Sequence, residues 1–292
     1  MQGLIALSEL DLLFGLILMV TISVSLAVMT VKTATVWNQQ QLTIGFLVTA
    51  LLTASWHFSL HDHAITSRIL PFENLIIVGN WFLPFSAILG GIAFRSTQGS
   101  FWSKFKMPFL LMLTGLFATV YPLYGYEPMS DPCQSAEGHC LQTSRVTCSP
   151  ACAVNLLKEK EIESTEAEMI RCCLCREGTY WQGVYRGLRQ KTHNHAIDVE
   201  IFQGSVEELR AMTPGFLMLR VGIGHFQQCD SVYLTDYGWE RGRYHSVILT
   251  RFLEVNGNES VEVIDPEIGV EHWSLQDLQV LYQGHGVRLV ER

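Results

Sequence analysis

Residues 244–266, YHSVILTRFLEVNGNESVEVIDP, decide the fold of the second half of the chain. Two apolar runs flank Asn256-Gly257, a dipeptide that is a strong signal for a tight hairpin turn. His245 opens the first run and Asp265 closes the second. Because a hairpin brings the open ends of its two strands together, we expect these two side chains to lie within reach of each other.

The rest of the second half changes character along its length. Pro150 at an early helical position and a capping pattern that starts at Ser164 indicate helices first, and alternating apolar residues indicate strands later. We expect helices at 147–158, 164–171, 181–191, 205–212 and 274–282, and strands at 196–202, 216–221, 246–255, 260–264 and 286–290. Helices followed by an antiparallel sheet are typical of an α+β domain, here residues 129–292.

Four long apolar stretches without charge precede this domain, within residues 1–128. They cover 12–31, 43–60, 74–94 and 107–126, and each has about the ~20 residues that a helix needs to cross the bilayer core. We therefore expect an all-α membrane domain of four transmembrane helices in a lipid bilayer, with Pro84 and Pro122 as kink sites. Four buried helices of a soluble domain are the weaker interpretation, because soluble helices rarely run so long without charge.

Charge separates the two halves. Residues 1–128 carry five Lys/Arg and five Asp/Glu, which leaves 15 Lys/Arg and 23 Asp/Glu for residues 129–292 and assigns the net charge of −8 to them. An acidic domain without a basic patch repels phosphate backbones, so nucleic acid is not expected as a partner. Loops rich in Lys and Arg favour the cytoplasmic side. The first and third loops hold Lys32, Arg95, Lys104 and Lys106, against Arg68 elsewhere, so this multi-pass protein is expected to place its second domain outside the cytoplasm.

The second apolar stretch ends in three histidines, His57, His61 and His63. His57 and His61 are four residues apart and share a helix face, so together with Asp62 they could bind a metal or haem. The alternative, which we favour, is a set of polar side chains at the membrane interface.

Cys148 is the candidate nucleophile of the second domain. It begins an expected helix, and the unpaired N–H groups of a helix N-terminus lower the pKa of a thiol. In a cysteine hydrolase His245 would serve as general base and acid, and Asp265 would orient it. Gln142 and the backbone N–H of Cys148 would stabilise the oxyanion. His225 is a rival base, although no apolar strand follows it.

This ordered set resembles the papain-like cysteine peptidases that remove double-glycine leaders from bacteriocins. The matching segments lie within about 134–290 and comprise Gln142 six residues before Cys148, Gly178-Thr179 before a helix, His245 before Ser246-Val247-Ile248-Leu249, Asp265-Pro266 before Gly269, and the closing stretch 275–284. The resemblance implies a papain-like fold and a bacterial thiol protease that acts on a peptide or protein, after a Gly-Gly pair. It implies catalytic roles for Cys148, His245, Asp265 and Gln142, no cofactor, and a secretion or export system as a candidate partner.

Three features depart from that family. Ser149 stands where a Gly usually follows the nucleophile. Residues 222–243 form a longer segment than the short turn usual before the His, and we expect this segment to cover or reshape the cleft. Many relatives are fused to an ATP-driven exporter, whereas this chain contains no Gly-Lys-Ser/Thr phosphate-binding loop.

All eight cysteines lie in the second half. Cys133 and Cys140 flank a short loop and could pair. For the others, disulfides are the first interpretation, free thiols the second, and a zinc site of Cys152, Cys172, Cys173 and Cys175 the third. Cys148 set aside, an odd number remains, so at least one more thiol stays free or joins two chains; the last candidate is Cys229.

Two alternatives to a peptidase remain open. One is a catalytically silent module of the same fold that binds peptides, although such a module has no need of the whole set of Cys, His, Asp and Gln. The other is a thiol enzyme of another class, an acyl transferase or a redox protein that uses Cys172 to Cys175.

Overall fold

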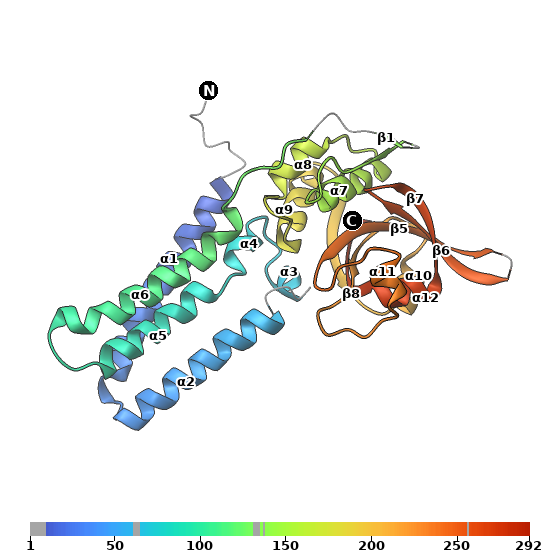
Figure 1. Cartoon of the computed structure of the whole chain (residues 1–292). Coiled ribbons are helices and arrows are strands. Elements are labelled where there is room, and N and C mark those ends of the chain that lie inside the picture. Colours follow the sequence, from blue (N-terminus) through green and yellow to red (C-terminus); the bar gives the residue numbers. More distant parts are fainter. Residues whose placement is uncertain (1–9, 61–64, 131–134, 137, 256) are drawn as a thin grey trace. The chain divides into compact units, whose positions relative to one another are not determined.

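The computed structural model describes residues 10–60, 65–130, 135–136, 138–255 and 257–292 (Figure 1). The chain divides into two compact units, Met1–Tyr124 and Gly125–Arg292. The first unit consists of helices, drawn from blue to green, and the second combines helices with strands, drawn from green to red.

Within its described residues, the first unit holds four helical segments that are long and apolar enough to cross a membrane: Leu10–Val36, Gln39–Phe58, Leu75–Ser96 and Phe101–Leu123. They are built from α1 (Leu10–Thr33), α2 (Gln39–Ser55), α4 (Leu75–Val78) with α5 (Phe82–Ser96), and α6 (Phe101–Val120). Shorter helical elements lie between these helices or after the last one: η2 (Ala34–Val36), the π-helical η3 (Trp56–Leu60), α3 (Ile65–Ile69) and η4 (Tyr121–Leu123). The four apolar helices expected from the sequence are therefore present.

Helix α5 is the centre of the first unit. It packs against α1, α2 and α6, and 78% of the third apolar segment is buried, compared with 17–22% of the other three. Small residues permit the close approach, since Gly91 lies against Thr30 of α1 and Gly115 of α6 lies against Ser86. The outer helices consequently turn much of their apolar surface outward, as helices in lipid do.

The prolines do not act where the sequence suggested. The third segment is interrupted at residues 79–81, before Pro84, and Pro84 lies in the first turn of α5, where its missing N–H breaks no helical hydrogen bond. Pro122 lies in η4, beyond the end of α6. Pro108 is the proline inside α6. The expected kinks at Pro84 and Pro122 were therefore wrong, because neither proline lies in the interior of a long helix.

In the second unit helices precede an antiparallel sheet, as the α+β pattern predicts. The helices are α7 (Cys148–Glu159), α8 (Glu166–Cys172) and α9 (Trp181–Thr192). The sheet has the order β3-β8-β4-β5-β6-β7, with β3 (Ile197–Gln203), β4 (Leu217–Gly222), β5 (Tyr244–Val255), β6 (Asn258–Asp265), β7 (Gly269–Ser274) and β8 (Tyr282–Glu291). The other elements among the described residues of this unit are three short helices and a small hairpin: α10 (Val206–Met212), α11 (Val232–Thr235), α12 (Leu275–Leu281), β1 (Ser135–Ala136) and β2 (His139–Cys140).

Alternation along β5 divides the core between the two faces of the sheet. Val247 and Leu249 are fully buried in an apolar cluster that includes side chains of α10 and α12. Ser246 points to the opposite face, where its hydroxyl lies 2.8 Å from that of Ser149 and its carbonyl accepts a hydrogen bond from the Cys152 thiol at 3.2 Å. Strand β5 therefore holds the start of α7 against the sheet.

The second unit departs from the expectation at α8, β7 and β8, and it also contains α11 and the β1–β2 hairpin, which were not expected. Helix α8 is capped by Thr165, one residue later than Ser164, because the Thr165 hydroxyl accepts the N–H of Glu168 in a capping box. Strand β7 was not expected; its sequence GVEHWS is polar, and it forms by pairing with β6 at the edge of the sheet. Strand β8 begins at Tyr282, directly after α12, which is earlier than the expected start at residue 286.

Candidate active site

Cys148 is the first residue of α7, and Thr147 is the N-cap. The Thr147 hydroxyl donates to the Ser144 carbonyl at 3.0 Å and does not cap the helix. The Thr147 side chain thus leaves the N–H groups of Cys148 and Ser149 uncapped, and these groups favour a negative charge. The predicted helix start at Cys148 is confirmed.

The β5–β6 hairpin brings the expected histidine and aspartate together. His245 Nε2 lies 3.0 Å from Asp265 Oδ1. Asp265 is buried, and its Oδ1 also accepts the N–H of Glu267 at 2.7 Å. The hairpin forms as the turn signal predicted, although Asn256 lies outside the described residues.

Cys148 and His245 shift each other's pKa, through hydrogen bonding and through charge. With Nε2 of His245 engaged by Asp265, Nδ1 is the ring nitrogen left for the thiol. Burial alone raises the pKa of the Cys148 thiol, but the hydrogen bond and positive charge of His245 outweigh burial, so that pKa lies below its ordinary value. Burial alone lowers the pKa of His245, but hydrogen bonds to Asp265 and Cys148 raise it to about 10. The pair favours a thiolate beside an imidazolium.

Gln142 is tied to the same hairpin. Its N–H donates to the Pro266 carbonyl at 2.6 Å, which joins the segment before α7 to the turn after Asp265. Its side-chain Oε1 is buried and has no hydrogen-bond partner among the described residues. This unmet atom is an acceptor, whereas an oxyanion would have to be stabilised by the side-chain NH₂ group, which donates.

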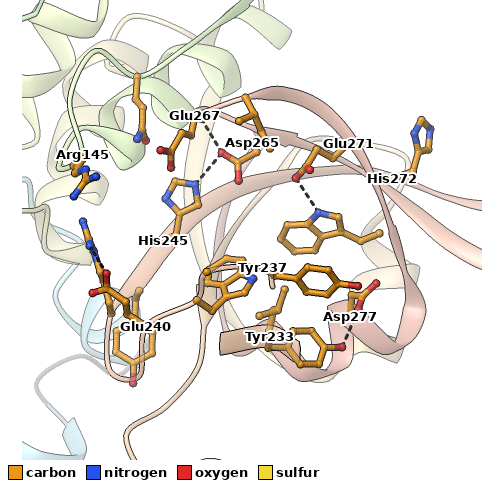
Figure 2. Close-up of a pocket in the computed structure, with 18 residues that line it drawn as sticks. Arg145, Tyr233, Tyr237, Glu240, His245, Asp265, Glu267, Glu271, His272 and Asp277 are labelled. Atoms are coloured by element: carbon orange, nitrogen blue, oxygen red, sulfur yellow. Dashed lines mark hydrogen bonds and ion pairs between the residues drawn. The ribbon is translucent and has the colours of Figure 1, made fainter. Parts of the chain in front are cut away.

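A cavity of about 590 Å³ opens beside His245. Figure 2 shows the imidazole pointing toward Asp265 at the edge of this cavity. The far walls carry Tyr233, Tyr237 and Trp239 from residues 222–243, together with Trp273 of β7. The long segment before the histidine therefore shapes the cleft, as the sequence led us to expect.

The rival base lies elsewhere. His225 is exposed, and its ring packs against Gly242. It is neither among the groups that act on the Cys148 thiol nor among the residues that line the cavity. His245 is the histidine that the structure pairs with Cys148.

The remaining cysteines correct the disulfide expectation. Cys140 is disulfide-bonded, and its expected partner Cys133 lies outside the described residues. The other five that the structure describes are free thiols: Cys152, Cys172, Cys173, Cys175 and Cys229. In the described parts of the chain no group of three or more His, Cys, Asp or Glu side chains is placed to hold a metal ion, which leaves the zinc hypothesis without support there.

The histidine cluster of the second apolar stretch is described only at His57. Its ring lies edge-on to those of Phe58 and Phe82, at centroid distances of 5.1 and 5.6 Å. His61 and His63 lie outside the described residues. The observed contacts of His57 are those of a packed aromatic ring and do not favour the metal hypothesis.

Sequence patterns did not identify two features of the site. One is the Ser149–Ser246 hydrogen bond, which joins the start of α7 to β5. The other is Trp239, whose ring lies edge-on to His245 at a centroid distance of 6.4 Å. The only hint of the tryptophan in the sequence is the clustering of aromatic residues at positions 233, 237 and 239.

No protein-family model matches this sequence, and no curated protein matches it. Among solved structures, the peptidase domain of Streptococcus ComA, a bi-functional ABC transporter in a quorum sensing pathway, aligns over 52% of this chain and 96% of its own at 14% identity, with a TM-score of 0.39. A double glycine motif protease from an AMS/PCAT transporter, in complex with its leader peptide, aligns over 56% and 100% at 14% identity, with a TM-score of 0.37. A periplasmic domain of the Vibrio vulnificus EpsAB fusion protein, from a type II secretion system, aligns over 50% and 48% at 16% identity, with a TM-score of 0.30. These neighbours are of different kinds, so the similarity does not specify an activity.

Proposed function

We propose that the protein is a membrane-anchored cysteine peptidase with a papain-like catalytic unit. The observation that carries the proposal is the hydrogen bond between His245 and the buried carboxylate of Asp265, together with the lowering of the Cys148 pKa by His245 at a helix N-terminus. A nucleophile, a base and an orienting group in hydrogen-bond contact are the requirement for covalent catalysis by a thiol.

The residues divide the reaction between them. The Cys148 thiolate attacks the carbonyl carbon of the peptide bond, and the resulting oxyanion is stabilised by the amide of Gln142 and the backbone N–H of Cys148. His245 then donates its proton to the leaving amine, and Cys148 is left as a thioester. His245 next removes a proton from water, which hydrolyses the thioester and regenerates the thiolate.

The four apolar segments support a site held at a bilayer surface, where a peptide that emerges from or resides in the membrane would reach it. On this proposal the substrate is a leader or membrane-delivered peptide, and the resemblance of the sequence motifs favours cleavage after a Gly-Gly pair. The catalytic unit would lie outside the cytoplasm, beside a secretion or export system.

The thiol environments speak against a redox enzyme built on the other cysteines. Burial raises the pKa of Cys172, of Cys173 and, to about 11, of Cys175, so these sulfurs stay protonated and unreactive at neutral pH. The silent peptide-binding module remains the alternative, and the lowered pKa of Cys148 counts against it because a pure binder needs no activated thiol.

The pH dependence of Cys148 alkylation tests the proposal. We would treat the full chain in lipid nanodiscs with iodoacetamide and measure labelling of each cysteine by peptide mass spectrometry. Cys148 should react rapidly well below the free-thiol pKa of ~8.5. His245→Ala should remove this reactivity, because only the hydrogen bonds of Ser246 and Ser149 would then oppose the rise of the Cys148 pKa by burial. Cys229, half-buried in the same unit, is the internal control.

Slow labelling of Cys148 that is indifferent to His245 would contradict the proposal and favour the binding module. His225→Ala provides the matched control, since His225 is exposed and away from the site. It should leave the profile of Cys148 unchanged.

A further inference from the structure

The cavity beside His245 is walled by an ordered segment. Between β4 and β5, Gly242 N–H donates to the Ile223 carbonyl at 2.7 Å, which closes the two ends of the segment on each other. The Gln227 side chain donates to the Val280 carbonyl at 2.6 Å, and the Tyr233 hydroxyl donates to Asp277 at 2.8 Å. Two hydrogen bonds thus attach the segment to α12, so this wall of the cavity is an ordered part of the second unit.

Aromatic rings line this wall from the catalytic histidine outward. Trp239 lies edge-on to His245 and also edge-on to Trp273, both at centroid distances of 6.4 Å. Tyr233 and Tyr237 form a further edge-to-face pair at 5.6 Å, and all four rings line the cavity. Ring faces attract cations, particularly those of tryptophan.

The far end of the cavity is negatively charged. Glu271 accepts the indole N–H of Trp273 at 3.0 Å, and Asp277 accepts the Tyr233 hydroxyl at 2.8 Å, so both carboxylates are held by uncharged donors. Glu267 is exposed at the rim, and Figure 2 shows it away from this end, between Asp265 and Arg145. Among the described residues no Lys or Arg pairs with these three acids, whereas Glu240 is already matched by Arg243 at 3.2 Å. Figure 2 shows Arg145, another cation of the lining, on the other side of His245 from Glu271 and Asp277.

The chemistry of the site fixes which part of a peptide would reach this end. His245 must protonate the leaving amine, so the leaving amine lies against His245. Residues on the carboxyl-terminal side of the scissile bond then continue past the imidazole, away from Cys148. The cavity lies on that side, since His245 lines it and Cys148 does not.

We propose that this cavity binds a lysine or arginine side chain on the carboxyl-terminal side of the scissile bond, with its cation over the aromatic wall and facing Glu271 and Asp277. This inference rests on the proposed peptidase function and adds the chemical class of the substrate residue. An acidic side chain in the same place would meet the carboxylates of Glu271 and Asp277, with which no Lys or Arg of the described residues pairs.

Acyl transfer to amino acid amides tests the inference without knowledge of the natural substrate. The full chain in nanodiscs is acylated with benzyloxycarbonyl-Gly-Gly 4-nitrophenyl ester, which forms the Cys148 thioester and releases 4-nitrophenol. An added amino acid amide then attacks the thioester; the new amide bond forms, the bond to Sγ breaks, and the proton of the amine passes to His245. Mass spectrometry of the products from arginine amide, glutamine amide and glutamate amide measures the preference.

Arginine amide should be used about tenfold better than glutamine amide, and glutamate amide worst. In the double variant Glu271→Gln, Asp277→Asn, the product ratios, corrected for the acylation rate, should fall to within about twofold of unity. The new amides can still accept the indole N–H of Trp273 and the hydroxyl of Tyr233. Glu254→Gln, an exposed glutamate outside the cavity, is the matched control and should keep the preference.

Each outcome decides a separate point. Cys148-dependent release of 4-nitrophenol without a preference for arginine amide, or with a preference that survives in the double variant, overturns the inference and leaves the proposed peptidase standing. Absence of Cys148-dependent release overturns the proposed function, and the inference with it.

Discussion

Cys148 and Cys175 both lie close to the start of α7, yet their environments shift their pKa values in opposite directions. Cys148 opens a helix, and His245 lowers its pKa against the effect of burial. Cys175 donates to the Val146 carbonyl at 3.2 Å, and burial raises its pKa to about 11. The comparison teaches that a charged partner separates a reactive thiol from an inert one. Location near the start of α7 does not, and neither does the number of neighbouring thiols.

The largest expected effect breaks this comparison directly. Cys148→Ala should reduce hydrolysis of the Gly-Gly 4-nitrophenyl ester to background, a loss of roughly 10³-fold or more, because no other described thiol has a base. Cys175→Ser keeps a hydrogen-bond donor for Val146 and should retain activity within about threefold. Equal losses in the two variants would mean that the thiols act together, which would favour the redox alternative.

A second change removes the negative charge of Asp265 beside His245. Asp265→Asn should lower the pKa of His245 from about 10, because the imidazolium loses its carboxylate. Less imidazolium then faces Cys148, so the pH at which alkylation begins should rise and ester hydrolysis should fall by roughly 10²–10⁴-fold. Parallel alkylation of the fully buried Cys173 reports unfolding. An unchanged pH profile in a folded variant would remove Asp265 from the site.

The smallest expected effect concerns the hydrogen bond between Ser149 and Ser246, which joins the start of α7 to β5. Ser149→Ala or Ser246→Ala leaves one buried hydroxyl without its 2.8 Å partner and should destabilise the second unit by about 1–3 kcal/mol. The double variant should cost less than the sum of the two, because no orphaned hydroxyl remains. The temperature at which Cys173 becomes accessible to alkylation measures this. Additive losses would show that the two hydroxyls are satisfied separately.

Local patterns predicted much of the architecture. The starts of α7 and α9, the β5–β6 hairpin and the apolar helices follow from capping, turn and hydropathy signals that act over a few residues. The sequence also picked out Cys148, His245 and Asp265, since each stands at the end of an expected element. It missed β7, whose polar sequence forms a strand only because β6 supplies a partner edge.

What escaped prediction depends on contacts between distant segments. The free state of Cys152, Cys172, Cys173 and Cys175 follows from where each side chain points in the packed core, which spacing along the chain does not encode. The same holds for Trp239, which reaches His245 because residues 222–243 fold back on β4 and α12.

By itself the sequence determined the apolar helices, the order of helices and sheet, and the identity of the residues proposed for catalysis, because periodicity, turns and caps are local properties. Only the tertiary structure decided that His245, and not His225, meets Cys148, that burial raises the pKa of the other thiols, and that aromatic rings and carboxylates form a cavity beyond the histidine. Those outcomes arise from desolvation and from charges brought together across long sequence separations, and both exist only once the chain has packed.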